Sequence, residues 1–276
     1  MPVGHERQAP RALRDCRELL AVLSSWVPKM CMVRCIIGNP EEPMWTDLAV
    51  SDGSTMRAWV ARPDGAEPHA GLLVLQEAFG VNAHIQDVAG RFAARGFIAI
   101  APELFHRTAP GLDASYGDFP AVMPHVRAMT PDGMAADLRA AFDWLTGPAQ
   151  VGRSRVAAVG YCMGGRAAFL ANATLPLACA VSYYGSGIVP ALADRVPALS
   201  GPQLFFWGGR DDHIPPEQYR AVDDALRAAG RPHVSVVFSE AGHAFFCDAR
   251  SAYHPAAARE SWALTLAFLQ DHLSQG

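Results

Sequence analysis

A five-residue segment, Gly160-Tyr161-Cys162-Met163-Gly164, restricts the possible fold more than any other part of the chain. The apolar run at 155–159 before it is typical of a buried parallel strand, and residues 165–170 after it are typical of the start of a helix. A Gly-x-nucleophile-x-Gly turn between a strand and a helix holds its central residue in a strained backbone conformation with little space around it, which is why glycines flank it. The segment therefore predicts a nucleophilic cysteine raised on a sharp turn.

The remainder of the chain alternates between short apolar runs and helical patterns. This alternation predicts an α/β fold with a mostly parallel central sheet of about eight strands and helices on both faces. The segment 102–130, rich in Pro and Gly, is long for a connection in a compact domain, and we expect it to form a lid or a wall of the substrate site. Strands are expected at 45–51, 56–61, 72–75, 97–100, 155–159, 177–182, 203–207 and 233–238, and helices at 83–95, 132–145, 165–170, 216–229 and 255–273.

The length of 276 residues suits one catalytic domain with a single large core. We assign this domain to residues 44–276. Residues 1–43 mix Arg, Cys and Pro without a clear strand or helix partner, and Met44 could itself be a start site. The hypothesis is that they form an N-terminal extension that is optional or comes from a mis-assigned start. The pair Cys31-x-x-x-Cys35 within it has no second Cys/His pair at a spacing that completes a zinc site.

The composition argues against several classes of partner. The formal charge of −4 comes without a basic block or stripe, so nucleic acid is not expected. No apolar run reaches the roughly 18–20 residues that a membrane span requires, and the short apolar stretch at 19–27 lacks a clear signal cleavage site. The six cysteines are scattered rather than arranged as a disulfide framework. We expect a cytoplasmic protein with reduced thiols and a small-molecule substrate, and the oligomeric state stays open.

A cysteine nucleophile needs a base to form the thiolate, and the base needs an orienting group. In a sheet of this kind the partners follow the nucleophile in the order acid, then histidine, each on a loop after a later strand. Asp211 follows the expected strand at 203–207, and His243 follows the one at 233–238. Because parallel strands end at one edge of the sheet, these loops should meet there. The predicted catalytic triad is Cys162, Asp211 and His243.

Each of these residues also has an ordinary structural interpretation. Cys162 could be a buried thiol, since free cysteines are among the most buried residues, but its place between two glycines favours the nucleophile. Asp212 competes with Asp211, and one of the two could cap the following helix. The spacing of Asp211 within the segment 208–215 favours it as the acid.

At this point the chain resembles the dienelactone hydrolase (carboxymethylenebutenolidase) family of the α/β-hydrolase superfamily. Six pieces of sequence in the right order carry the resemblance, which spans about residues 44–273. They are Gln76-Glu77-Ala78-Phe79-Gly80-Val81-Asn82, Ala101-Pro102-Glu103-Leu104-Phe105, Gly160-Tyr161-Cys162-Met163-Gly164-Gly165, Tyr183-Tyr184-Gly185, Gly208-Gly209-Arg210-Asp211 and Ala241-Gly242-His243.

The resemblance implies further roles. Glu77 corresponds to the family glutamate that interacts with the resting thiol and helps to create the thiolate, although it could instead be an ion-pair partner of Arg166 or Arg210. The oxyanion hole would consist of the backbone N–H groups of Met163 and Ala78. The implied reaction is acyl transfer from a lactone or small ester through a thioester on Cys162, which needs no metal or organic cofactor.

The substrate is less well defined by the resemblance. Family members that cleave dienelactones hold the substrate carboxylate with arginines, one of them four positions after the catalytic histidine, where this chain has Cys247. Arg107 and Arg127 are the available alternatives, with Arg107 taken as the candidate. Candidate pocket residues of lower specificity are Phe79, Tyr184 and Phe246. Core packing is an equally reasonable role for the two phenylalanines, and it is the more common role for an aromatic residue that follows a core strand, as Tyr184 does.

Two other functions remain open from the sequence. A thiol redox protein could use Cys162, although this chemistry usually requires a resolving cysteine or a C-x-x-C pair. Alternatively, the chain could be a hydrolase homologue that has lost activity and only binds a ligand. The complete set of triad residues argues against the second alternative.

Overall fold

The computed structural model describes residues 43–65 and 69–274. The predicted extension 1–43 lies outside this range except for its last residue, and so does the pair Cys31 and Cys35. The hypothesis of an optional extension therefore stays a prediction.

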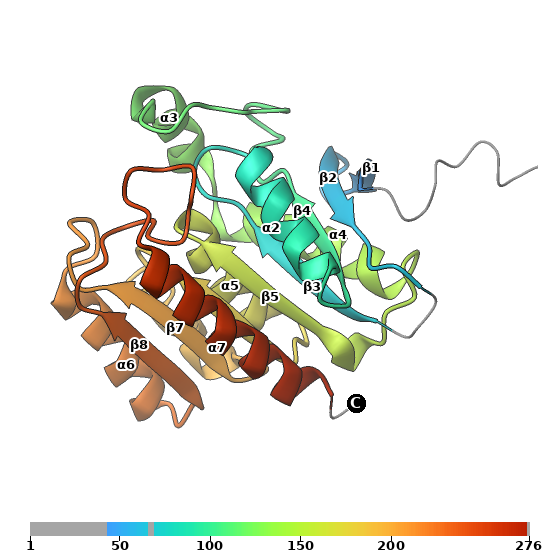
Figure 1. Ribbon diagram of the computed structural model, residues 1–276. Helices are drawn as coiled ribbons and strands as arrows, with labels where there is room; N and C mark the ends of the chain where they lie inside the picture. Colours follow the sequence, from blue (N-terminus) through green and yellow to red (C-terminus); the bar gives the residue numbers. More distant parts are fainter. Residues whose placement is uncertain (1–42, 66–68, 275–276) are drawn as a thin grey trace, which may run out of the picture. The chain divides into compact units, whose positions relative to one another are not determined.

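The described residues form one eight-stranded sheet with the strand order β1-β2-β4-β3-β5-β6-β7-β8 (Figure 1). The pairs β1–β2 and β2–β4 are antiparallel, and every other neighbouring pair is parallel. The predicted α/β fold with a mostly parallel sheet is confirmed. The strands are β1 (Met44–Ala49), β2 (Thr55–Ala61), β3 (Ala70–Leu75), β4 (Phe97–Pro102), β5 (Val156–Tyr161), β6 (Cys179–Tyr183), β7 (Gln203–Gly208) and β8 (His233–Phe238).

Helices cover both faces of this sheet. Figure 1 shows α2 (Ala83–Ala93) and α7 (Pro255–Leu273) on one face and α4 (Pro131–Thr146), α5 (Met163–Thr174) and α6 (Pro216–Ala228) on the other. Two short 3₁₀ turns, η3 (Arg153–Arg155) and η4 (Ala193–Ala198), lie in the connections. Because both faces are covered, β3, β4, β5, β6 and β7 are buried at every position, which explains their continuous apolar sequences.

The segment 102–130 differs from its predicted form as a loop, because it contains a helix, α3 (Phe119–Ala128). The side chain of Asp118 caps this helix by accepting a hydrogen bond from the N–H of Ala121. The fully buried Val122 fixes α3 against a small apolar cluster with Ala78 and Phe79. Tertiary packing thus makes a helix from a segment whose prolines and glycines indicate irregular structure. The helix covers the residues that follow β3, the position expected of a wall.

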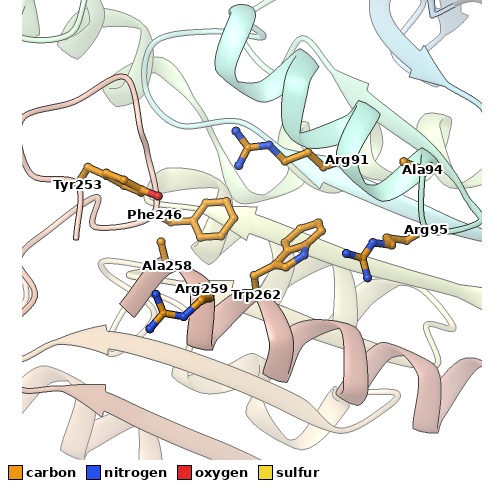
Figure 2. A pocket seen from close by; sticks show the side chains of 8 residues that line it. All are labelled: Arg91, Ala94, Arg95, Phe246, Tyr253, Ala258, Arg259 and Trp262. Atoms are coloured by element: carbon orange, nitrogen blue, oxygen red, sulfur yellow. The ribbon is translucent and has the colours of Figure 1, made fainter. Parts of the chain in front are cut away.

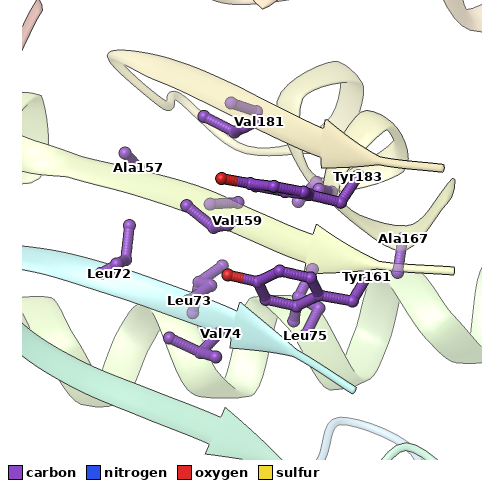
Figure 3. Packing of buried hydrophobic residues seen from close by; sticks show 14 of the residues in the cluster. Leu72, Leu73, Val74, Leu75, Ala157, Val159, Tyr161, Ala167, Val181 and Tyr183 are labelled. Carbon is purple, nitrogen blue, oxygen red and sulfur yellow. The ribbon is translucent and has the colours of Figure 1, made fainter. Parts of the chain in front are cut away.

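The core lies on both sides of the central strands, and Figure 3 shows its part around β3, β5 and β6. Tyr161 and Tyr183 are register partners on neighbouring strands, and their ring centroids are 4.8 Å apart. Both side chains are fully buried. Together these contacts fix Tyr161, the residue before Cys162, within the core.

Two glycines allow the chain to turn sharply from β5 into α5. A Cβ atom on Gly160 would lie 1.8 Å from the carbonyl oxygen of Gly164. One on Gly164 would lie 2.2 Å from the carbonyl oxygen of Leu75 and 2.5 Å from that of Gln76. No side chain fits at these distances, so the turn can press against the end of β3 only because both residues are glycine. This contact brings the beginning of α5 to the segment that contains Glu77 and Ala78.

We predict that Gly164→Ala lowers the free energy of unfolding by roughly 2–3 kcal/mol, because the added methyl group overpacks against backbone that cannot move independently. Urea denaturation followed by circular dichroism measures this change. Gly90→Ala is the matched control, since a Cβ at this helical position meets nothing within 4 Å and should leave stability unchanged or raised by up to about 1 kcal/mol. Equal stability of the two variants would contradict the close-contact argument.

Candidate active site

Cys162 stands between β5 and α5 with a left-handed backbone conformation, φ 55° and ψ −117°. Residues other than glycine rarely adopt a positive φ, and strained backbone of this kind is concentrated at functional positions. The N–H of Cys162 donates a hydrogen bond of 3.0 Å to the carbonyl of Tyr183, which anchors the turn to the neighbouring strand. The residue is half-buried. The sulfur is therefore fixed at the carboxyl edge of the sheet.

His243 and Asp211 reach this edge from the loops after β8 and β7. The Nε2 atom of His243 lies 3.1 Å from the Sγ atom of Cys162. On the other side of the ring, Nδ1 lies 2.8 Å from Oδ2 of Asp211. The structure thus brings the three predicted triad residues together in the order nucleophile, base and orienting acid.

The carboxylate of Asp211 is itself held in place by backbone donors. Its Oδ1 atom accepts hydrogen bonds from the N–H groups of His213 at 2.8 Å and Ile214 at 3.1 Å. The side chain is 1% exposed, whereas Asp212 is exposed. Asp211 is therefore the residue whose two oxygens are both engaged, one by the turn and one by His243.

The surroundings of His243 favour its protonated form. Burial by itself lowers the pKa of His243, but hydrogen bonds to Asp211 and Cys162, together with their charges, outweigh burial and raise the value to about 10. The ring of Tyr184 lies 5.1 Å away and that of His213 lies 5.0 Å away, measured between centroids. An imidazolium in this position stabilises a thiolate on Cys162.

Glu77 lies in the same region but its partner is Arg250. An oxygen of the carboxylate, Oε1, is 3.5 Å from a guanidinium nitrogen of Arg250. The prediction that Arg166 or Arg210 would be its ion-pair partner is wrong, and Arg210 pairs with Glu240 instead. The carboxylate is 1% exposed, and its other oxygen, Oε2, has no hydrogen-bond partner among the described residues. Burial raises the pKa of Glu77, and the charges of Arg250 and His243 oppose this increase.

Arg250 is the functional candidate that the sequence reasoning missed. Its guanidinium carbon lies 5.4 Å from the ring centroids of both Phe79 and Tyr116, and its side chain is 15% exposed. The aromatic faces and Glu77 form three sides of a cation site. The sequence contains a signal for it, because Arg250 lies in the same loop as His243, shortly after Cys247, which occupies the position of the family arginine.

Tyr116 connects this site to the segment before α3. Its hydroxyl accepts hydrogen bonds from the side-chain amide of Asn82 at 3.1 Å and from the thiol of Cys247 at 3.4 Å. The ring of Phe79 packs edge-on against that of Tyr116, with centroids 5.0 Å apart. Phe79 is therefore buried beneath the segment that covers the site rather than open to it.

The other candidate substrate residues have different surroundings. Tyr184 is fully buried, and its hydroxyl has no hydrogen-bond partner in the described structure. Phe246 stacks on Tyr161 with ring centroids 5.2 Å apart. The guanidinium of Arg107 is bound by Asp137 at 2.8 Å and Asp52 at 2.7 Å, so its charge is already compensated. The assignments of these residues to substrate binding remain predictions, and the geometry favours Arg250 as the cation.

The predicted oxyanion donors lie on segments that touch. Met163 is the first residue of α5, so its N–H precedes the helical hydrogen-bond ladder. Ala78 follows Glu77 directly after the end of β3, the strand end against which Gly164 packs. The positive end of the α5 dipole also faces this position.

Three further observations, on thiols, metal ligands and membrane-spanning helices, apply to the residues that the structure describes. Cys162, Cys179 and Cys247 are free thiols. No group of three or more His, Cys, Asp or Glu side chains within the described ranges could hold a metal ion. None of the described helices is both long enough and apolar enough to cross a membrane.

Comparison with known proteins agrees with this geometry. The model of the dienelactone hydrolase family matches residues 56–273. The chain belongs to this family. The match includes the elbow, the loops of Asp211 and His243, and Glu77.

Individual relatives and solved structures give the same result. A Salmonella typhimurium protein named "putative carboxymethylenebutenolidase" is 38% identical over 227 residues, which cover 77% of this chain and 81% of the relative. An Escherichia coli K12 protein of the same name is 35% identical over 233 residues, covering 80% and 84%. The crystal structure of a "putative dienelactone hydrolase" from Klebsiella pneumoniae has a TM-score of 0.74 and 32% identity, and the match covers 85% of this chain and all of that one.

We predict that Asp211→Asn lowers the pKa of His243 from its value of about 10, because the ring loses the carboxylate that stabilises its proton. NMR titration of the imidazole signals measures the shift. Asp212→Asn, at the exposed neighbouring position, is the matched control and should leave the titration unchanged.

The same pKa predicts how stability depends on pH. The folded state binds the proton of His243 more tightly than the unfolded chain, in which the pKa of histidine is about 6.5. Its stabilising contribution is therefore complete below that pH and disappears as the pH rises to about 10. If Asp211→Asn and Asp212→Asn lose stability alike over this pH range, the ion pair between Asp211 and His243 does not set the pKa of His243.

Proposed function

We propose that the protein is a cysteine-dependent hydrolase that cleaves a lactone or small ester of the carboxymethylenebutenolide type through a thioester on Cys162. The observation that carries the proposal is the distance of 3.1 Å between the sulfur of Cys162 and Nε2 of His243, with Asp211 at 2.8 Å on the far side of the ring. Membership of the dienelactone hydrolase family supports the same reaction class.

The reaction would begin when the thiolate of Cys162 attacks the carbonyl carbon of the substrate. A carbon–sulfur bond forms, and the negative charge moves to the carbonyl oxygen, towards the N–H groups of Met163 and Ala78. The ring or ester C–O bond then breaks, and the leaving oxygen takes a proton from His243. Water, deprotonated by His243, hydrolyses the thioester and regenerates the thiol.

Glu77 would assist thiolate formation by accepting the thiol proton as substrate arrives. Two observations support this role. Burial raises the pKa of the carboxyl group towards that of a useful base, and Oε2 has no hydrogen-bond partner in the described structure. The charge of His243 acts on the same carboxylate.

Arg250 would bind an anionic group of the substrate, which points to a lactone or ester that carries a carboxylate. Its ion pair with Glu77 is long, at 3.5 Å, and the remaining contacts are aromatic faces. A substrate carboxylate could therefore bind the guanidinium at a shorter distance and release Glu77 from its charge. Substrate binding and thiol activation would then be coupled through one ion pair.

We predict that Cys162→Ala reduces kcat/KM for a chromogenic ester or a dienelactone by on the order of a thousandfold or more, because the residual activity comes from binding and oxyanion contacts alone. Steady-state hydrolysis assays measure the loss. Cys179→Ala removes a buried thiol of β6 and is the matched control, expected to keep near-normal activity.

The same assay separates the two alternatives. A loss below tenfold in Cys162→Ala would overturn the assignment of the nucleophile. Rapid cycling with peroxide and thiol in the absence of hydrolysis would instead favour a redox protein, and the absence of both activities would favour a binding protein.

We also predict that Arg250→Gln raises KM for a lactone with a free carboxylate by roughly tenfold to a hundredfold, since a hydrogen bond to a charged group contributes about 1.5–3 kcal/mol. KM for the carboxamide of the same lactone should change much less. Arg220→Gln, on the exposed surface of α6, is the matched control. An equal effect of Arg250→Gln on KM for the carboxylate and for the carboxamide would show that the arginine does not bind the carboxylate.

A further inference from the structure

A pocket lies between α2 and α7 (Figure 2). Its volume is about 350 Å³, which is within the range of small-molecule sites. The residues that line it are Arg91, Ala94, Arg95, Phe246, Tyr253, Ala258, Arg259 and Trp262. None of the triad residues is among them, so the pocket is separate from the thiol.

Aromatic rings form the apolar part of this pocket. In Figure 2 the side chains of Phe246 and Trp262 lie between the two helices, with Tyr253 at one end. The ring centroids of Phe246 and Trp262 are 6.1 Å apart, and those of Phe92 and Trp262 are 4.5 Å apart. These contacts hold flat apolar surfaces in place without a ligand, which suits a planar ring.

The polar part of the pocket carries positive charge alone. Three of the eight described lining residues are arginines, and none is acidic. Arg91 is bound by Asp87 and Asp248, each at 2.6 Å. Arg95 has no carboxylate partner among the described residues. Arg259 is exposed, and its guanidinium nitrogen lies 3.9 Å from a carboxylate oxygen of Glu260. The charges of Arg95 and Arg259 are therefore largely uncompensated.

The helix at the floor of the pocket adds to this charge. Arg259 lies in the second turn of α7, and the first turn of that helix contains no acidic residue. The positive end of the helix dipole is thus not neutralised at the end of the pocket where Arg259 lies. In Figure 2 the guanidinium group of Arg95 is turned towards Trp262, whereas that of Arg259 lies at the opposite end of the pocket, so an anionic group beside the indole ring meets Arg95.

We propose that this pocket is a second binding site, distinct from the catalytic thiol, for a small planar ring that carries one carboxylate or similar anionic group. The ring packs on Trp262, and the anion binds Arg95. The proposal does not depend on the reaction catalysed at Cys162.

The position of the pocket gives it contact with the catalytic loop. Phe246 lies three residues after His243 and stacks on Tyr161, the residue before Cys162, at 5.2 Å. Arg91 holds Asp248 of the same loop. Because Phe246 is one of the lining residues, a ligand in this pocket is next to the segment that positions His243.

The test uses benzoate as the probe and isothermal titration calorimetry on the full chain carrying Cys162→Ala. We expect saturable binding with a Kd on the order of 1 mM or tighter. The double variant Arg95→Gln/Arg259→Gln should weaken binding at least tenfold, and benzamide, which lacks the charge, should bind at least tenfold more weakly than benzoate. The double variant Arg220→Gln/Arg227→Gln, exposed on α6, is the matched control and should bind benzoate normally.

Two results would overturn the proposal. One is the absence of saturable benzoate binding to a variant that remains folded by circular dichroism. The other is binding that is lost in Arg250→Gln but retained in Arg95→Gln/Arg259→Gln, because the probe would then occupy the active site. Since Cys162→Ala is inactive by design, failure here is distinguishable from failure of the hydrolase assignment.

Discussion

The candidate active site depends on the backbone of one residue, Cys162, which is held in a left-handed conformation that residues with a side chain do not favour. The surrounding structure maintains this strain by the close approach of Gly160 and Gly164 to neighbouring backbone and by the hydrogen bond from Cys162 to Tyr183. The triad geometry follows from it. A relaxed turn would move the sulfur away from a ring that Asp211 and its backbone donors keep in a fixed position.

Much of this arrangement could be predicted from the sequence because it is local or follows from strand order. The strand, turn and helix around Cys162 are specified by consecutive residues, and the loops of Asp211 and His243 meet because they follow neighbouring parallel strands. The boundaries of β8 and α7 were predicted to the residue. In these places the periodicity of the sequence and the topology of the sheet give the same answer.

The features that escaped prediction depend on contacts between distant segments. Glu77 and Arg250 are 173 positions apart, and their meeting depends on the path of the loop between β8 and α7, which no local pattern specifies. Helix α3 was missed because Pro120 and Pro124 indicate irregular structure, whereas burial of Val122 stabilises the helix. Arg107 was a reasonable candidate by sequence position, but Asp137 and Asp52 occupy its guanidinium.

The loop between β8 and α7 contains the proposed base His243 and, after it, the proposed ligand-binding residues Phe246 and Arg250. The proposed nucleophile and its glycines belong to the β5–α5 turn. Natural divergence or laboratory grafting could therefore exchange residues 246–253 between homologues and alter which molecules are accepted, while the sulfur and its strained support stay as they are. Such an exchange would change both proposed ligand sites at once, since the two share this loop.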